Sequence, residues 1–280
     1  MDLSELVVER RDSLSPAERR IAEAVLREPE QVAFGTLAEV ATHAGASGTS
    51  VLRMATKLGF DGFGALQAHV QDDLARRLRP ARQRIRLAAS DTLSRTLALE
   101  IDNLHSTFGG IDRAAFDAAS RHVAESPGRV LLLASECVAG IGVAIADTLA
   151  TLRDGVVLVQ GNDVRLGKIL GRVTRQDVAL VIDFRRYDAW LLRALEVVTD
   201  AGSYVIALSD SPLSPLAAVA DAAFTVSAVG AGPFDSHAVT LALGQALVAN
   251  AAAQLAATAA SRLDSVEANW MAMQALTKDE

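Results

Sequence analysis

Hydrophobic residues follow two different spacings along the chain, one helical and one typical of buried strands. Between residues 36 and 60, the sequence TLAEVATHAGASGTSVLRMATKLGF predicts two short helices joined at Gly45, because glycine accepts the positive φ angle of a tight connection. The second helix is predicted to start after Ser47, an N-cap residue type. It would bury one stripe at the i, i+3, i+4, i+7 spacing, made of Val51, Met54, Ala55 and Leu58. This segment therefore predicts a helix-turn-helix.

An earlier stretch, LSPAERRIAEAVLREPEQVA, predicts a third helix of the same small domain. Ser15 and Pro16 suit the N-cap and first helical positions, and Glu18 stands at the capping-box position. Ile21 and Val25 lie four residues apart, on one face. The N-terminal part is therefore predicted to be all-α.

After residue 127 the pattern changes to short apolar runs that alternate with helical stretches. The runs predict five buried strands, at 130–134, 156–159, 178–182, 204–208 and 223–226. Helices are predicted at 141–152, 189–201 and 238–260. This alternation predicts an α/β domain with a five-stranded parallel sheet flanked by helices, in which ligands bind beyond the carboxyl ends of the strands.

The outward side of the second helix of the helix-turn-helix carries polar and basic groups suited to DNA. Arg53 can form a bidentate contact with guanine in the major groove, and Ser50 and Lys57 can reach base edges or phosphates. The candidate DNA-binding residues are Ser47, Thr49, Ser50, Arg53 and Lys57. An ordinary amphipathic helix with a solvated polar face is the alternative interpretation.

Composition and charge support a folded, two-domain chain rather than a uniformly basic nucleic-acid coat. The 280 residues are 50% hydrophobic, with a formal net charge of −7. Residues 1–86 hold 13 Arg/Lys against 12 Asp/Glu, which leaves the remainder at −8. Six arginines cluster around Pro80, namely Arg76, Arg77, Arg79, Arg82, Arg84 and Arg86. They are predicted either to touch DNA phosphates or to form a solvated linker.

Cysteine usage and hydropathy favour a cytoplasmic protein. Cys137 is the single cysteine, which excludes an internal disulfide framework and leaves no zinc-type cluster, so no metal or cofactor is predicted. The N-terminus MDLSELVVERR lacks the pattern of a secretory signal. No charged residue lies between His237 and Arg262, but alanine dominates this stretch, so a buried helix is predicted rather than a membrane span.

Residues 1–77 resemble the N-terminal DNA-binding domain of the RpiR (MurR/RpiR) family of bacterial transcriptional regulators. That domain ends in the stretch seen here as LRMATKLGFDGFGALQAHV. Gly48 and Met54 stand where a better helix former and Phe are common, which weakens the start of the helix without altering its outward face. The resemblance implies a regulator that binds operator DNA.

Residues 110–262 resemble the SIS (sugar isomerase) domain that RpiR-family regulators carry. The matching phrase is AGSYVIALSDSPLSPLAAVADAAFTV, in which the segment 214–216 and Asp221 fit the family signature. The resemblance implies four parts: a helix-turn-helix domain (1–77), an Arg-rich linker with a connecting helix (78–109), a ligand-sensing domain (110–262) and a C-terminal tail (263–280).

The two turns that hold a sugar phosphate in SIS domains differ here from the family pattern. The first turn reads ASECVAG, with Ala134 and Glu136 where glycines are expected. The second reads DFRRYD, with Asp183 and Arg185 in place of serines and Arg186 in place of glycine. Two hypotheses remain open: the arginines hold an anionic group of an amphoteric or acidic metabolite, or Asp183 pairs with one of them and closes the pocket.

The predicted ligand-binding residues lie at the strand ends and at the start of the long alanine-rich helix. They are Ser135, Glu136, Asp183, Arg185, Arg186, Tyr187, Ser209, Ser236 and His237. Glu136 and His237 are the nearby acid–base candidates, and their spacing indicates no catalytic pair.

We therefore expect a cytoplasmic, non-enzymatic transcriptional regulator whose SIS-like domain senses a small anionic metabolite, either a sugar phosphate or another carbohydrate-derived or acidic compound. A homodimer or homotetramer is expected, because one short recognition helix reads few base pairs; the apolar helix at 93–104 could supply part of the dimer surface. The alternatives are a sugar-phosphate isomerase or lyase with an N-terminal interaction domain, and a scaffold that binds DNA without responding to any metabolite.

Overall fold

The chain divides into two compact units, Met1–Ala89 and Ser90–Glu280, and the division falls inside the predicted linker. A computed structural model describes residues 3–27, 29–78, 91–161, 163–212 and 214–275. The clustered arginines 79, 82, 84 and 86 lie outside the described residues, so their predicted phosphate contacts stay a prediction. The predicted domain boundaries likewise remain predictions.

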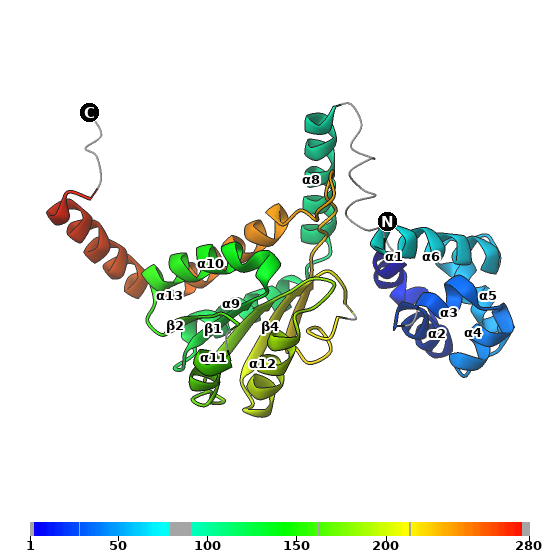
Figure 1. Cartoon of the computed structure of the whole chain (residues 1–280), viewed down its shortest axis with the longest axis horizontal. Coiled ribbons are helices and arrows are strands. Elements are labelled where there is room, and N and C mark those ends of the chain that lie inside the picture. The colour runs from blue at the N-terminus through cyan, green and yellow to red at the C-terminus, as the bar shows by residue number, and fades with distance from the viewer. Residues whose placement is uncertain (1–2, 28, 79–90, 162, 213, 276–280) are drawn as a thin grey trace. The chain divides into compact units, whose positions relative to one another are not determined.

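The first unit is all-α, as predicted (Figure 1). Its elements are α1 (Leu3–Glu9), η1 (Arg11–Ser13), α2 (Pro16–Arg27), α3 (Pro29–Phe34), α4 (Leu37–His43), α5 (Gly48–Lys57) and α6 (Gly62–Leu78). Helix α5 packs against α2, α4 and α6. Met54 and the rest of the predicted stripe of α5 are buried, in one core with Ile21 and Val25 of α2.

Local capping fixes where these helices begin. The amide of Ser15 donates to Glu18 Oε2 at 2.7 Å, and the amide of Glu18 donates to Ser15 Oγ at 3.4 Å, so the predicted capping box is present. Ser47 caps α5 by accepting from the Ser50 amide at 3.2 Å. Gly45 adopts φ +58° between α4 and α5, the conformation for which the sequence predicted a glycine. The helix-turn-helix is therefore formed as predicted.

The second unit is built on a five-stranded parallel sheet in the order β2-β1-β3-β4-β5. Its strands are β1 (Val130–Ala134), β2 (Val156–Val159), β3 (Val178–Ile182), β4 (Tyr204–Ser209) and β5 (Ala222–Thr225). All four pairings are parallel. Its helical elements are α8 (Thr92–Gly109), α9 (Arg113–Glu125), η2 (Glu136–Val138), α10 (Ala139–Leu152), α11 (Asp163–Leu170), α12 (Ala189–Asp200) and α13 (Ala238–Met273). The predicted fold class is confirmed.

Helices cover both faces of this sheet (Figure 1). Alternate strand residues, such as Leu132 and Leu180, face a core shared with α9, α10 and α13. Their neighbours along the strands, such as Leu131 and Val181, face a second core with α11 and α12. Since both faces are buried, every residue of β1 and β3 is buried, which explains their continuous apolar runs.

Helix α13 is longer than predicted and contains an irregular residue. It continues to Met273, past the predicted end at residue 260, and Ala256 has non-helical angles of φ 37° and ψ −107°. The segment Ala238–Ala256 is long and apolar enough to cross a membrane, with 39% of its most apolar window buried. Its buried residues, among them Leu243 and Leu247, pack in the same core as the sheet. The segment therefore packs against the sheet, as expected for the buried helix that the sequence predicts.

Candidate functional sites

The outward face of α5 is open. Thr49 and Arg53 are exposed, and Ser50 is half-buried. Ser47 and Ser50 share a hydrogen bond between their hydroxyls at 2.9 Å, so both belong to the helix cap. Among the described residues, the guanidinium of Arg53 makes no hydrogen bond or ion pair. A cation on a rigid helix with no internal partner is suited to a base edge or phosphate.

Lys57 differs from Arg53 because it is bound within the unit. Its Nζ donates to Glu18 Oε2 at 2.7 Å and to the carbonyl oxygen of Ser13 at 2.8 Å. The hydrogen bond from Lys57 and the amide of Ser15 lower the pKa of the buried Glu18 carboxyl to about 2. Lys57 therefore ties the end of α5 to the start of α2, a role that the sequence did not reveal. Its predicted DNA contact stays a prediction.

The second candidate site lies at the carboxyl edge of the sheet, where the ends of β1, β3 and β4 meet. β1 and β3 are neighbours, and the helices after them cover opposite faces, which makes this pair the switch point of the topology. Ser135 follows β1, Asp183 follows β3, and Ser209 ends β4. The structure therefore brings the predicted strand-end residues to one edge.

Asp183 is buried and bound to the backbone. Its Oδ1 accepts from the Phe184 amide at 2.7 Å, and its Oδ2 accepts from the Asp188 amide at 2.8 Å. Burial raises the pKa of Asp183, although hydrogen bonds from Ser135 and these amides act in the opposite direction. Asp183 thus stabilises the second turn by accepting hydrogen bonds from two of its backbone amides.

In the described part of the chain, Asp183 does not form the ion pair with Arg185 or Arg186 that one of the two hypotheses required. Whether the pocket is open stays a hypothesis. Arg185 instead forms a two-pronged ion pair with Asp235, in which Nε donates to Oδ2 at 3.2 Å and Nη2 donates to Oδ1. The backbone amides already satisfy Asp183, so it gains little from a guanidinium. Arg185 is held by a loop residue that the sequence reasoning missed.

One carboxylate oxygen of Asp210 accepts three hydrogen bonds. Its Oδ1 accepts from the amide of Arg185 at 3.2 Å, from the hydroxyl of Tyr187 at 3.0 Å, and from Ser209 Oγ at 3.4 Å. Burial and the nearby Asp210 carboxylate raise the pKa of Tyr187 above its ordinary value. Tyr187 therefore keeps its proton at neutral pH and donates it to Asp210.

The first turn is bound by Asp188. Glu136 is exposed, and its backbone amide donates to Asp188 Oδ2 at 3.0 Å. Asp188 occupies the N-cap position of α12 but makes no side-chain cap there. Ser135 Oγ lies 3.2 Å from Cys137 Sγ. A carboxylate thus already sits on an amide at the start of a helical turn, where anions bind favourably.

Arg186 holds an unusual backbone conformation. Its φ is +69°, the left-handed region that glycine adopts without strain, and its side chain is exposed. Among the described residues, its guanidinium has no ion pair. The glycine expected at this position in the SIS pattern is therefore replaced by arginine while the glycine-like conformation is kept. Strain of this kind is concentrated at functional sites.

Ser236 and His237 precede α13, as predicted. Ser236 Oγ accepts from the Ala238 amide at 3.4 Å, and the His237 ring packs on Phe184 with centroids 4.8 Å apart. His237 Nδ1 is buried without a hydrogen-bond partner, and burial lowers the pKa of this imidazole. None of the contacts in the described part of the chain links His237 to Glu136, so no acid–base pair is formed.

Three aspartates of this edge were missing from the predicted site, namely Asp188, Asp210 and Asp235. Asp188 directly precedes a predicted helix and Asp210 is the second residue after a predicted strand, so position alone could have pointed to them. Asp235 lies in a loop, and its pairing with Arg185 spans 50 residues of sequence. No local signal could have identified that contact.

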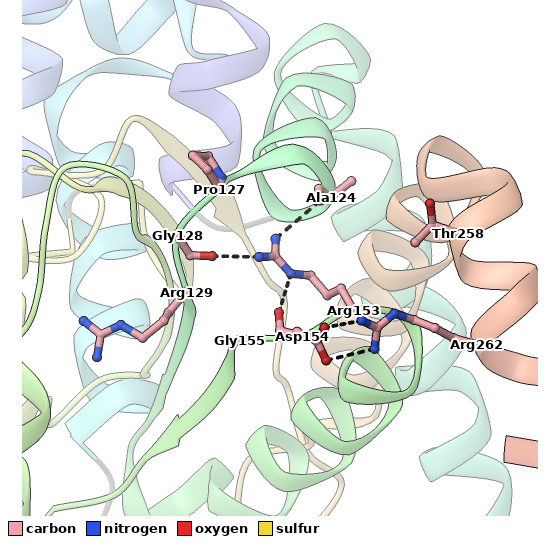
Figure 2. Close-up of a pocket in the computed structure, with 9 residues that line it drawn as sticks. All are labelled: Ala124, Pro127, Gly128, Arg129, Arg153, Asp154, Gly155, Thr258 and Arg262. Atoms are coloured by element: carbon pink, nitrogen blue, oxygen red, sulfur yellow. Dashed lines mark hydrogen bonds and ion pairs between the residues drawn. The ribbon is translucent and has the colours of Figure 1, made fainter. Parts of the chain in front are cut away.

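Two pockets lie at the opposite, amino-terminal edge of the sheet, and residues with structural contacts line them. One of about 330 Å³ is shown in Figure 2, where Arg153 points from the end of α10 toward the turn after α9. Arg153 donates to the carbonyl oxygens of Val123, Ser126 and Gly128, and Arg262 pairs with Asp154. Arg153 thus joins the end of α10 to the turn after α9, and Arg262 joins α13 to the turn before β2. Another pocket, of about 600 Å³, is lined partly by His122 stacked on Tyr204.

Comparison with known protein families matches both units. Residues 1–77 match the model of the helix-turn-helix domain of the rpiR family, and residues 124–250 match the SIS domain. An uncharacterized HTH-type transcriptional regulator of Haemophilus influenzae is 25% identical over 217 residues, which cover 75% of this chain and 74% of that protein.

Solved structures support the same fold. The sugar isomerase domain of an RpiR transcription factor from Sphaerobacter thermophilus is 22% identical with a TM-score of 0.59, covering 62% of this chain and 97% of that one. The Vibrio vulnificus NanR protein, in complex with ManNAc-6P, is 17% identical with a TM-score of 0.57, covering 98% of this chain and 100% of that one. At these identities the likeness concerns the fold alone.

Proposed function

The chain belongs to the RpiR family of helix-turn-helix transcriptional regulators that carry a SIS domain, and we propose that α5 reads operator DNA while the carboxyl edge of the sheet senses a small anionic metabolite. The observation that carries the DNA part is Arg53, which is exposed and has no partner among the described residues, on the outward face of the capped helix α5. Thr49 and Ser50 flank it on the same face and would contact bases or phosphates.

The effector part rests on the edge where β1, β3 and β4 end. Arg186 supplies an exposed cation there, and the turn after β1 supplies amides at the start of a helix. The related NanR structure contains ManNAc-6P, a sugar phosphate, which supports the same class of ligand for this chain. The site residues we propose are Ser135, Glu136, Asp183, Arg185, Arg186, Tyr187, Ser209, Ser236 and His237.

We further propose that the effector is bound and not converted. The proton-transfer candidates Glu136 and His237 have no mutual contact among the described residues, and His237 is held against Phe184 with a lowered pKa. Sugar-phosphate turnover by the purified protein, abolished in His237→Ala, would contradict this. We also propose a cytoplasmic location, because a transcriptional regulator must reach the chromosome.

Helix α8 supports assembly into a homodimer, because its buried side is polar and its solvent-facing side is apolar, the reverse of an ordinary surface helix. Its buried side is polar: Asn103 Nδ2 donates to the Val229 carbonyl at 2.9 Å, and Thr107 Oγ1 accepts from the Ser227 amide at 2.9 Å. Its solvent side carries an apolar stripe at helical spacing, namely Leu93, Leu97, Ile101, Leu104 and Phe108, with Leu93 86% exposed.

A second copy of the chain is the occupant that fits this stripe. Exposed apolar residues also lie at the end of α13, among them Leu263, Trp270 and Met273, and a second copy could bury them as well. Leu97→Glu combined with Ile101→Glu should therefore yield monomers in sedimentation velocity, whereas Ala98→Glu beside the stripe should not.

The experiment that tests the proposed function is selection of genomic fragments bound by the purified full chain, at fixed moderate salt. The parent protein should recover a short palindromic motif, because a two-fold dimer reads two half-sites. Arg53→Ala should fail to recover it, whereas Arg113→Ala, an exposed arginine on α9 of the second unit, should recover it. Equal recovery by the parent and Arg53→Ala would overturn the role of α5.

A further inference from the structure

The start of the first turn already holds an anion that belongs to the chain itself. β1 ends at Ala134, and the chain enters η2 and then α10. The amide of Glu136, the first residue of η2, donates to Asp188 Oδ2 at 3.0 Å. Amides that follow a parallel strand and open a helix are where phosphates and carboxylates of ligands bind. Here an internal carboxylate uses that donor.

Asp188 reaches this amide instead of capping its own helix. It precedes α12 with φ −69° and ψ 123°, the extended conformation from which an N-cap aspartate normally accepts from the first amides of the helix. Its side chain makes no such bond. The side chain therefore has two alternative positions: one across the turn at Glu136, which the structure shows, and one on the first turn of α12.

The second turn is arranged in the same way. Asp210 Oδ1 accepts the amide of Arg185 and the hydroxyl of Tyr187, and Asp235 holds the guanidinium of Arg185. Carboxylates of the chain thus accept from the Glu136 amide in the first turn and from Arg185 and Tyr187 in the second, and Arg186 has no ion pair among the described residues. An incoming anion can gain these donors only by displacing internal carboxylates.

We propose that Asp188 is a built-in competitor for the anionic group of the effector, and this inference rests on the effector site of the proposed function. An anion that binds the Glu136 amide and Arg186 displaces the Asp188 carboxylate, because two negative charges on one donor would repel each other at close range. The displaced carboxylate then caps α12. Anion binding at the first turn is thereby coupled to the start of α12, and affinity for a bare anion is kept low.

Calorimetric titration of the full chain with inorganic phosphate tests the competition. Asp188→Asn keeps the shape but removes the charge, and Asp188→Ala removes the side chain that occupies the amide. We expect both variants to bind phosphate at least ten times more tightly than the parent. Asp200→Asn is the matched control, because it makes the same charge change at the exposed far end of α12 and should bind like the parent.

Each outcome separates the inference from the function that it deepens. If the parent and both Asp188 variants bind phosphate with equal affinity, the anion site stands and the competitor role is wrong. If Asp188→Ala binds more weakly than the parent, Asp188 positions the Glu136 amide for the ligand, which also contradicts the proposal. If no variant binds phosphate, both the competition and the anionic effector fail, while recovery of DNA fragments by the parent still tests α5 independently.

A backbone readout tests the displacement directly. In the parent, the Glu136 amide resonance should move when phosphate is added, and the first amides of α12 should gain protection from hydrogen exchange as Asp188 caps them. In Asp188→Ala, phosphate should move Glu136 without protecting α12. Protection of α12 by phosphate in both proteins would overturn the proposed exchange of partners.

Discussion

The outward face of α5 and the carboxyl edge of the sheet treat their polar groups in opposite ways. On α5, Arg53 extends into solvent with no internal partner among the described residues, and only Lys57 of its two cations is bound within the unit. At the edge, Asp183 and Arg185 both have partners from the chain itself. A rigid surface with free donors can bind DNA without rearranging, whereas a site that satisfies its own groups must exchange contacts when a ligand binds.

The ion pair between Glu18 and Lys57 gives the largest expected effect on the first unit. Because the pKa of Glu18 is about 2 in the folded state, against 4.5 for the free group, its ionised form stabilises the fold. That contribution, about 2 kcal/mol once solvent screening of the partly exposed Lys57 is allowed for, is fully present above pH 4.5 and is lost as the pH falls toward 2. Glu18→Gln should lose it at neutral pH and should lack this acid response.

Hydrogen-exchange protection factors of α2 and α5 measure this effect in the full chain, since both tryptophans, Trp190 and Trp270, lie in the second unit. Glu23→Gln, an exposed position on α2, is the control and should keep the parent's acid response. The same loss of protection between pH 4.5 and 2 in Glu18→Gln would show that another group is responsible.

DNA affinity sharpens the contrast within α5. Arg53→Ala should weaken binding to the selected fragment by about 10- to 100-fold, the cost of losing a base or phosphate contact, without lowering the stability of the unit. Lys57→Met should lower stability but change the affinity of the folded fraction by less than about threefold, because Glu18 already holds the ammonium group. Fluorescence anisotropy, corrected for the folded fraction, measures both. A larger loss for Lys57→Met would reverse the assignment.

Strain at the edge predicts a stabilising change. Arg186 adopts φ +69°, so Arg186→Gly should stabilise the second unit by about 1 kcal/mol. Arg186→Ala removes the same charge but keeps the strain, so it should not gain stability. Urea unfolding followed by tryptophan fluorescence reports on this unit. Equal stabilities for the two variants would mean that charge, and not backbone strain, sets the cost.

The smallest predicted effect concerns the glycines around α5. A Cβ at Gly48 would meet only the Leu37 side chain at 3.6 Å, an ordinary contact, so Gly48→Ala should stabilise the first unit by about 0.5 kcal/mol. Gly45→Ala should destabilise it by about 1 kcal/mol, because φ is +58° there. The protection factors of α5 should therefore change in opposite directions, and a gain in Gly45→Ala would contradict this account of the turn.

Spacing gave the regular elements and missed contacts between distant residues. The runs at 130–134, 156–159 and 178–182 coincide with β1, β2 and β3, because strands buried on both faces must be continuously apolar. Helix α11 was not predicted, since its eight residues include Arg165 and Lys168 and make a weak apolar pattern. The continuation of α13 past residue 260 was missed because charged and polar residues interrupt the apolar pattern there and almost all of its residues are exposed.

The sequence by itself determined the class of each unit, the capped recognition helix and the edge at which the candidate ligand residues meet. These features follow from periodicity, capping chemistry and the topology of parallel sheets, which depend on neighbouring residues. Tertiary structure decided which charges pair: Lys57 with Glu18, Arg185 with Asp235, and Asp188 with the amide of Glu136. Such pairing depends on distances between segments 39 to 52 residues apart, which no local pattern encodes.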